Sequence, residues 1–117
     1  MNSLIKQILD AMRVNGKAIP HAFLYYEGHA NTYITYQQVD ADNPLRGDND
    51  LIGYADYYDF DIYTKGNYMS IVEQLKTDLK AHGFMWEQTL SSGDMYEPDT
   101  KYYHKTLCFA ILRQEEE

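Results

Sequence analysis

The 117-residue sequence predicts one α+β domain, in which a mostly antiparallel β-sheet carries two helices on one face. Two observations predict the elements: two segments have apolar residues at helical spacing, and several others alternate as strands do. A third observation predicts the sheet type. The expected order is helix, three strands, helix, two strands, and it lacks the regular βαβ alternation that makes parallel sheets. The chain also has the usual length of a single domain.

Both predicted helices are amphipathic. They cover residues 3–14, with Asn15 and Gly16 as the expected stop, and residues 68–82, with Gly83 after them. Because each has one apolar stripe, we expect both to cover the same sheet. The stripes consist of Leu4, Ile5, Ile8, Leu9 and Met12 in the first helix and Tyr68, Ile71, Val72, Leu75 and Leu79 in the second.

Five segments are predicted to be strands: residues 22–26, 32–39, 54–64, 84–90 and 102–113. The first two flank a turn-like stretch, so a β-hairpin is the simplest expectation for them. The third strand has an apolar face and an acidic face, because side chains alternate along a strand. Its apolar face carries Tyr54, Tyr58, Phe60 and Ile62, and its acidic face carries Asp59 and Asp61. In the last strand, Leu107, Phe109 and Ile111 are expected to point inward.

The segment 40–50 reads DADNPLRGDND and is rich in residues that favour turns. We expect it to form an exposed loop. Its charged residues are Asp40, Asp42, Arg46, Asp48 and Asp50.

The chain is acidic, with 18 Asp and Glu against 10 Lys and Arg and a net charge of -8. This charge disfavours direct binding of nucleic acid, because it repels phosphate and removes the counterion release that drives such binding. Two explanations for the acidity stay open: plain solubility, or a passage through which DNA slides without sticking. No window is apolar enough for a membrane helix, and the lone Cys108 with no secretory signal predicts an intracellular origin.

No motif for catalysis, metal binding or cofactor binding stands out. The four histidines lack the spacing of zinc ligands, the glycines are scattered, and the aspartates do not form a calcium loop. Asp59 and Asp61 share a strand face and could in principle hold a metal, but a solvent-facing strand side gives the same pattern. Cys108 lies among apolar residues, as a buried inert thiol does. We therefore expect no enzyme and no cofactor.

The tyrosines are the most distinctive component, at 12 of 117 residues. They are more than one sheet face can readily bury, so we expect some of them to contact a partner. The candidates are Tyr33, Tyr36, Tyr57 and Tyr63. Ordinary packing of aromatic side chains across neighbouring strands is the alternative.

Several segments, taken in order, carry a family resemblance that covers nearly the whole chain. They are the short opening helix, the 22–26 strand, Tyr33-Ile34-Thr35-Tyr36 before the Asp-rich loop, Asp59-Phe60-Asp61-Ile62-Tyr63, Gly66-Asn67-Tyr68, Gly83-Phe84, and Asp94-Met95-Tyr96-Glu97 before Tyr102-Tyr103-His104-Lys105. In this order the chain resembles the tail terminator, or tail completion, proteins of long non-contractile-tailed bacteriophages and prophages. None of these segments is a catalytic signature.

The resemblance implies a ring of identical subunits, commonly six, that caps the tail tube, stops its growth and offers its other side to the head connector. The implied partners are copies of the chain, the tail tube protein and the connector protein, with no membrane partner and with DNA passing through the ring. The implied location is the neck end of the virion tail, after synthesis in the host cytoplasm. Residues 40–50 would then be an interface or lumen loop.

Two other functions remain as alternatives. A small acidic binding or inhibitor protein that neutralises a basic partner would also carry a net charge of -8. A metal-dependent hydrolase would use Asp59 and Asp61.

Overall fold

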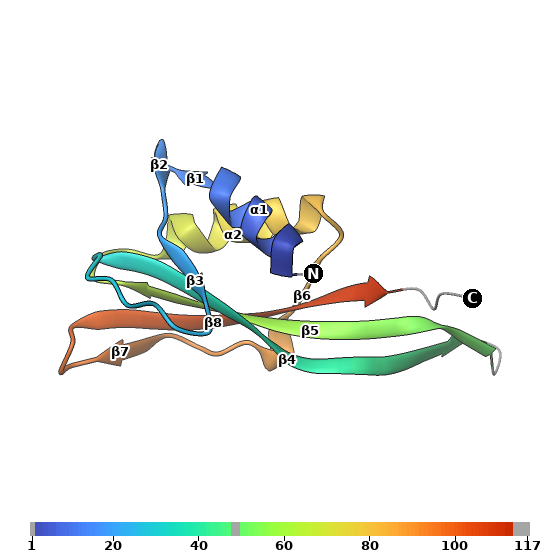
Figure 1. Cartoon of the computed structure of the whole chain (residues 1–117). Helices are drawn as coiled ribbons and strands as arrows, with labels where there is room; N and C mark the ends of the chain where they lie inside the picture. Colours follow the sequence, from blue (N-terminus) through green and yellow to red (C-terminus); the bar gives the residue numbers. More distant parts are fainter. Residues whose placement is uncertain (1, 48–49, 114–117) are drawn as a thin grey trace.

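The computed structural model describes residues 2–47 and 50–113, and it confirms the α+β fold. Two helices lie over one face of a mixed, mainly antiparallel sheet (Figure 1). In chain order the elements are α1 (Asn2–Ala11), β1 (Arg13–Val14), β2 (Lys17–Ala18), β3 (His21–Phe23), β4 (Thr32–Gly47), β5 (Asp50–Thr64), α2 (Met69–Ala81), β6 (Met85–Glu87), a short 3-10 helix η1 (Gln88–Leu90), β7 (Met95–Glu97) and β8 (Tyr102–Arg113).

The main sheet has the strand order β3-β4-β5-β8-β6, and β7 also pairs with β8. The hairpin expected between residues 22–26 and 32–39 is wrong. The strands found there, β3 and β4, are parallel, with His21 opposite Ile34 and Phe23 opposite Tyr36. The backbone of Leu24 explains the difference. It turns into the left-handed region, with φ 65°, and its N–H donates to the Tyr36 carbonyl. The chain then returns through a loop to begin β4 beside the start of β3, as a parallel pair requires.

The Asn15-Gly16 pair makes a hairpin turn and does not end a helix directly. Helix α1 stops at Ala11, and β1 and β2 pair with Val14 opposite Lys17. Asn15 and Gly16 both have positive φ, at 54° and 79°. This is the geometry that favours Asn-Gly in two-residue hairpins.

The hydrophobic core lies between the helices and the sheet face beneath them. Its centre is Phe60, whose ring packs edge-on against Phe84 and Phe109 with ring centroids 6.4 and 5.6 Å away. The core residues alternate along the strands, as predicted for β5 and β8. They comprise Ile5, Ile8, Leu9, Met12, Val14, Ile19, Ile34, Tyr36, Tyr58, Phe60, Ile62, Ile71, Val72, Leu75, Leu79, Phe84, Leu107, Phe109 and Ile111.

The segment predicted to be an exposed loop, residues 40–50, is mostly β-strand. β4 continues to Gly47 and β5 begins at Asp50, with Arg46 opposite Leu51 and Gly47 opposite Asp50. The pairing changes register at three points: between Gln38 and Asp40, between Asp40 and Asn43, and between Leu45 and Arg46. Such β-bulges accommodate residues that do not fit a regular ladder. Pro44 is tolerated because β4 is an edge strand here. Asp48 lies outside the described residues.

We call residues 39–47 and 50–53 the arm. Val39, at the base of the arm, is 47% exposed. Figure 1 shows the β4–β5 pair continuing well past the helices, and the molecule measures 49 × 26 × 23 Å. β3 reaches only as far as Tyr36 on one side, and β8 ends with Arg113 opposite Tyr54 on the other. Within the described residues, the arm is therefore a two-stranded ribbon with no third strand on either edge.

Candidate interaction surfaces

The sheet face away from the helices carries a column of stacked rings, which we call the tyrosine ladder. Tyr26 stacks on Tyr33 with centroids 4.5 Å apart, Tyr33 on Tyr63 at 4.8 Å, and Tyr63 on His104 at 4.1 Å. Tyr102 meets Tyr33 edge-on at 5.5 Å, and its hydroxyl donates to the Ala30 carbonyl at 2.6 Å. Such pairs stabilise a sheet by direct ring contact across strands.

The ladder rings are half-buried, although no helix covers them. Burial raises the pKa of Tyr63 to about 12 and also raises the pKa of Tyr33, because the charged phenolate loses hydration. Cross-strand packing, the alternative explanation for the tyrosines, therefore accounts for much of their buried area. Each of these rings also keeps part of its surface exposed.

The four candidate interface tyrosines do not share one location. Tyr33, Tyr57 and Tyr63 occupy the face away from the helices and are half-buried. Tyr36 is only 4% exposed and faces the core, with its ring 6.3 Å from that of Phe60. The expectation that Tyr36 lies on the surface is wrong, because the odd and even positions of β4 face opposite sides of the sheet. Of the predicted loop residues, Asp40, Asp42, Arg46 and Asp50 lie in the arm strands.

A polar cluster lies next to the ladder on the same face. The Asp61 carboxylate accepts hydrogen bonds from the Thr106 hydroxyl at 2.5 Å and from His104 Nε2 at 2.9 Å. Because both groups donate to one oxygen, His104 does not accept the Thr106 proton as a general base would. The contacts fasten β5 to β8 at this point.

Asp59 and Cys108 form the second polar pair of this face. Burial raises the pKa of the Asp59 carboxyl, and burial together with the nearby Asp59 charge raises the pKa of the Cys108 thiol to about 12. A thiol with that pKa stays protonated at neutral pH and is a poor nucleophile. Asp59 and Asp61 share this face, as predicted. In the described part of the chain, no group of three or more His, Cys, Asp or Glu residues could hold a metal ion.

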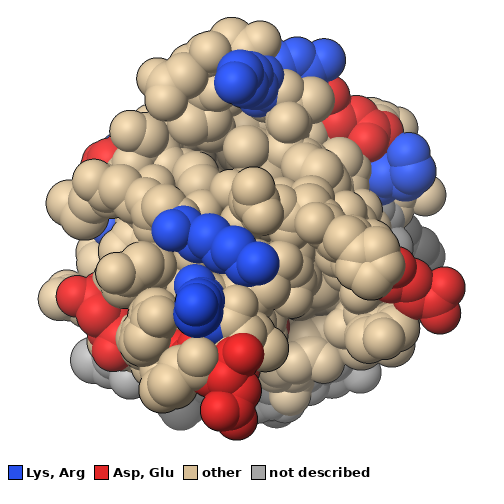
Figure 2. Space-filling view, turned by 90° about the vertical axis from the view of Figure 1, so that its left-hand side faces the viewer, with Lys and Arg blue, Asp and Glu red and all other residues tan. Residues whose placement is uncertain are grey.

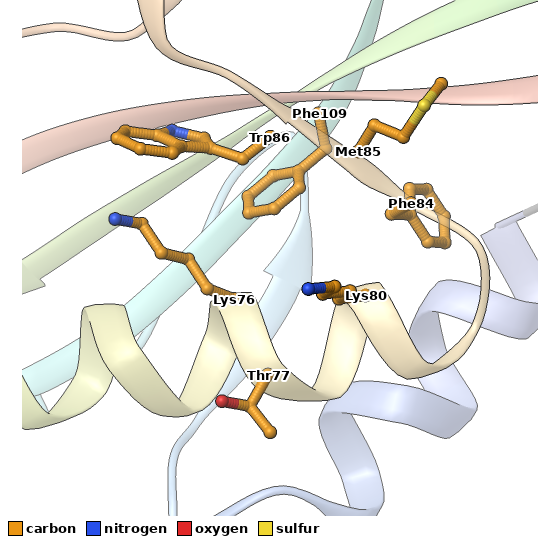
Figure 3. A pocket seen from close by; sticks show the side chains of 7 residues that line it. All are labelled: Lys76, Thr77, Lys80, Phe84, Met85, Trp86 and Phe109. Atoms are coloured by element: carbon orange, nitrogen blue, oxygen red, sulfur yellow. The ribbon is translucent and has the colours of Figure 1, made fainter.

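A groove of about 470 Å³ lies between α2 and β6, and sequence reasoning missed it. We call it the α2–β6 groove. Phe84 and Phe109 are buried, whereas Met85 and Trp86 remain 45% and 38% exposed. Figure 3 shows the Lys76 side chain extending from α2 toward Trp86, with Lys80 one turn further along the helix. The lining residues are Lys76, Thr77, Lys80, Phe84, Met85, Trp86 and Phe109.

Trp86 is held in a defined position within this groove. Its indole N–H donates to the Ser91 hydroxyl at 3.0 Å, and the Lys76 ammonium lies 3.5 Å from its ring centroid. This is a cation–π contact at short range. The sequence signals were a single tryptophan and two lysines four positions apart, which share a helix face.

The groove lysines lack the ion pairs that Lys6 and Lys105 form, and they share this lack with Lys17, Lys65 and Lys101 in the described part of the chain. Lys6 pairs with Asp10 at 2.8 Å, and Lys105 pairs with Asp94 at 3.2 Å. Among the described residues, neither Lys76 nor Lys80 forms an ion pair with a carboxylate. Within the part of the chain that the structure describes, the groove therefore presents two positive charges that form no ion pair with an acidic side chain.

The excess negative charge is unevenly spread. Figure 2 views the end of the molecule at the left of Figure 1, where basic and acidic side chains are interspersed and uncharged residues cover most of the surface. By contrast, residues 40–50, at the arm end, carry four aspartates and a single arginine. The charges thus distinguish the arm from the opposite end.

No protein-family model matches the chain, and no curated protein matches it. Among the described residues, neither helix has the length and apolar character needed to cross a bilayer.

Proposed function

We propose that this chain is a ring-forming tail terminator, a structural virion protein that caps a phage tail tube and joins it to the head connector. The observation that carries the proposal is the arm, a two-stranded ribbon that projects beyond the two helices (Figure 1). A two-stranded ribbon alone in water is marginally stable at best. We therefore expect the arm to be covered by another chain in an assembly.

A ring supplies that cover through one repeated contact. In a closed ring, each subunit uses two different patches, one for each neighbour. The arm and the body are different patches of one molecule, so contact between them is of this head-to-tail type. The tyrosine ladder adds a broad aromatic surface for the tube or the connector.

The segments that carry the resemblance support the same proposal, because three of them lie side by side. Residues 33–36 are in β4, residues 59–63 in β5 and residues 102–105 in β8, which are neighbouring strands of the sheet. Tyr33 is paired with Tyr63, and Tyr63 with His104. These segments together build the tyrosine ladder.

The acidity also fits a protein through which DNA passes. Aspartates repel phosphate, so a ring with acidic residues toward its lumen does not hold the DNA. Residues 40–50 supply four of them. Solubility remains the simpler explanation for the acidic residues elsewhere on the chain.

The test is to inactivate the gene in the phage or prophage that carries it and to image the particles by electron microscopy. We expect tails of uncontrolled length with no heads attached, and restoration when the wild-type chain is supplied in trans. Particles whose tails keep a uniform length and are joined to heads would contradict the proposed function.

The acidic arm favours a second candidate, a small binding protein that neutralises a basic partner. Its stoichiometry separates it from the terminator. A complex of one copy of the chain with a basic partner, which dissociates when the salt concentration is raised, supports the binding protein. A ring of copies at a tube end supports the terminator.

A further inference from the structure

We propose that the arm of one copy docks in the α2–β6 groove of the next copy, and that this contact closes the ring. The inference rests on the proposed function and names the two patches that meet. The groove presents Lys76 and Lys80 without carboxylate partners in the described part of the chain, and the arm carries the aspartates Asp40, Asp42 and Asp50 against one basic residue, Arg46. Opposite charges on the two patches set both the partner and its orientation.

The groove offers more than charge to an incoming strand. β6 is the last strand of the sheet, and its outer edge pairs with no other strand in the described residues. A strand that adds to such an edge gains main-chain hydrogen bonds. Exposed Met85 and Trp86 supply apolar contact beside that edge. Aromatic and methionine side chains of this kind are enriched at protein interfaces.

The occupant is an arm and not a detached peptide, because the arm has the matching features. Both of its outer edges lack a strand partner among the described residues, and residues 40–50 carry four aspartates. The arm projects away from the body of its own molecule (Figure 1). Docking between copies is therefore head to tail, and each copy supplies one arm and one groove.

The experiment reverses the charge of each patch separately in the full chain. One variant carries Lys76→Glu and Lys80→Glu, and the other carries Asp40→Lys and Asp42→Lys. Association is followed by sedimentation velocity over a concentration series. We expect each variant alone to associate at least about tenfold more weakly than wild type, because like charges then face each other.

Mixing the two variants in equal amounts is the decisive step. The acidic arm of the first fits the basic groove of the second, and the basic arm of the second fits the acidic groove of the first. We expect the mixture to recover association to within about threefold of wild type, since alternating copies restore every charge pair. A mixture that associates no better than the separate variants would overturn the inference.

Trp86 gives a second readout, because it is the only tryptophan and lies in the groove. Its emission maximum should shift with concentration in wild type and in the mixture with Asp40→Lys, Asp42→Lys, but not in that variant alone. Lys17→Glu with Lys65→Glu is the control for the groove variant, since it makes the same charge change at exposed lysines outside the groove. Glu27→Lys with Asp99→Lys is the control for the arm variant. Association that falls equally in the controls would contradict the specific contact.

Removing residues 114–117 should leave association unchanged. A loss of association in that variant would make the C-terminal glutamates the occupant and overturn the proposal.

The docking contact and the proposed function can fail separately. If association fails the mixing test while the gene is still required for tails of uniform length, the docking contact is wrong and the proposed function stands. If the mixture recovers but tail length does not depend on the gene, the function is wrong instead.

Discussion

The body and the arm of this molecule are built from the same two strands but differ in what surrounds them. In the body, β4 and β5 lie beneath two helices and bury Ile34, Tyr36, Phe60 and Ile62. In the arm, the same strands continue past the helices (Figure 1), and Val39 at its base is 47% exposed. The comparison teaches that pairing sets the length of a strand, whereas burial sets how much it stabilises the fold.

The largest expected effect breaks the body side of this comparison. Phe60 is fully buried, so Phe60→Ala should lower the free energy of unfolding by about 3–5 kcal/mol, through lost burial and the cavity left behind. Val39 in the arm is 47% exposed, and Val39→Ala should change it by no more than about 0.5 kcal/mol. Urea unfolding followed by circular dichroism measures both. Equal losses in the two variants would show that the arm and the body are not distinct in energy.

An intermediate effect concerns the tyrosine ladder. The Tyr102 hydroxyl donates to the Ala30 carbonyl, so Tyr102→Phe should cost about 0.5–1.5 kcal/mol by removing that bond while keeping the ring contacts. Tyr103→Phe is the matched control, because Tyr103 is 44% exposed. Its expected change is within about 0.5 kcal/mol. A control as destabilising as Tyr102→Phe would argue against the hydrogen bond as the cause.

The sequence predicted the body better than the arm, for a physical reason. The stripes of Ile71, Val72, Leu75 and Leu79 and the alternation around Phe60 follow directly from burial against a layer, and the structure confirms them. Residues 40–47 have turn-forming composition, but pairing with β5 and several bulges makes them strand. Local composition does not determine whether a segment pairs with a strand elsewhere in the chain, or in which register.

The same limit explains the surfaces. Alternation along residues 32–39 puts Tyr33 and Tyr36 on opposite faces, but it does not show which face the helices cover, so both stayed candidates for the surface until the structure buried Tyr36. The α2–β6 groove joins Lys76 and Lys80 to Trp86 across two elements. Residue types alone indicated a lone tryptophan and two lysines; the close approach of α2 to β6 makes them one site.

The smallest expected effect is a gain in stability, and it sharpens the contrast between covered and uncovered surface. Burial, together with the nearby Asp61 charge, raises the pKa of Asp59 above 3.8, against the effect of the Cys108 thiol. A carboxyl whose folded pKa is raised disfavours the folded state while it is ionised in both states, and this cost disappears as the pH falls through the folded pKa toward the unfolded value. Asp59→Asn should therefore be more stable than wild type at pH 7, and the difference should vanish below about pH 4. Urea unfolding of both proteins across pH tests this, with Asp99→Asn, an exposed site in the turn before β8, as the control. A gain for Asp59→Asn that persisted unchanged at low pH would mean that removing the half-buried charge of Asp59 is not its source.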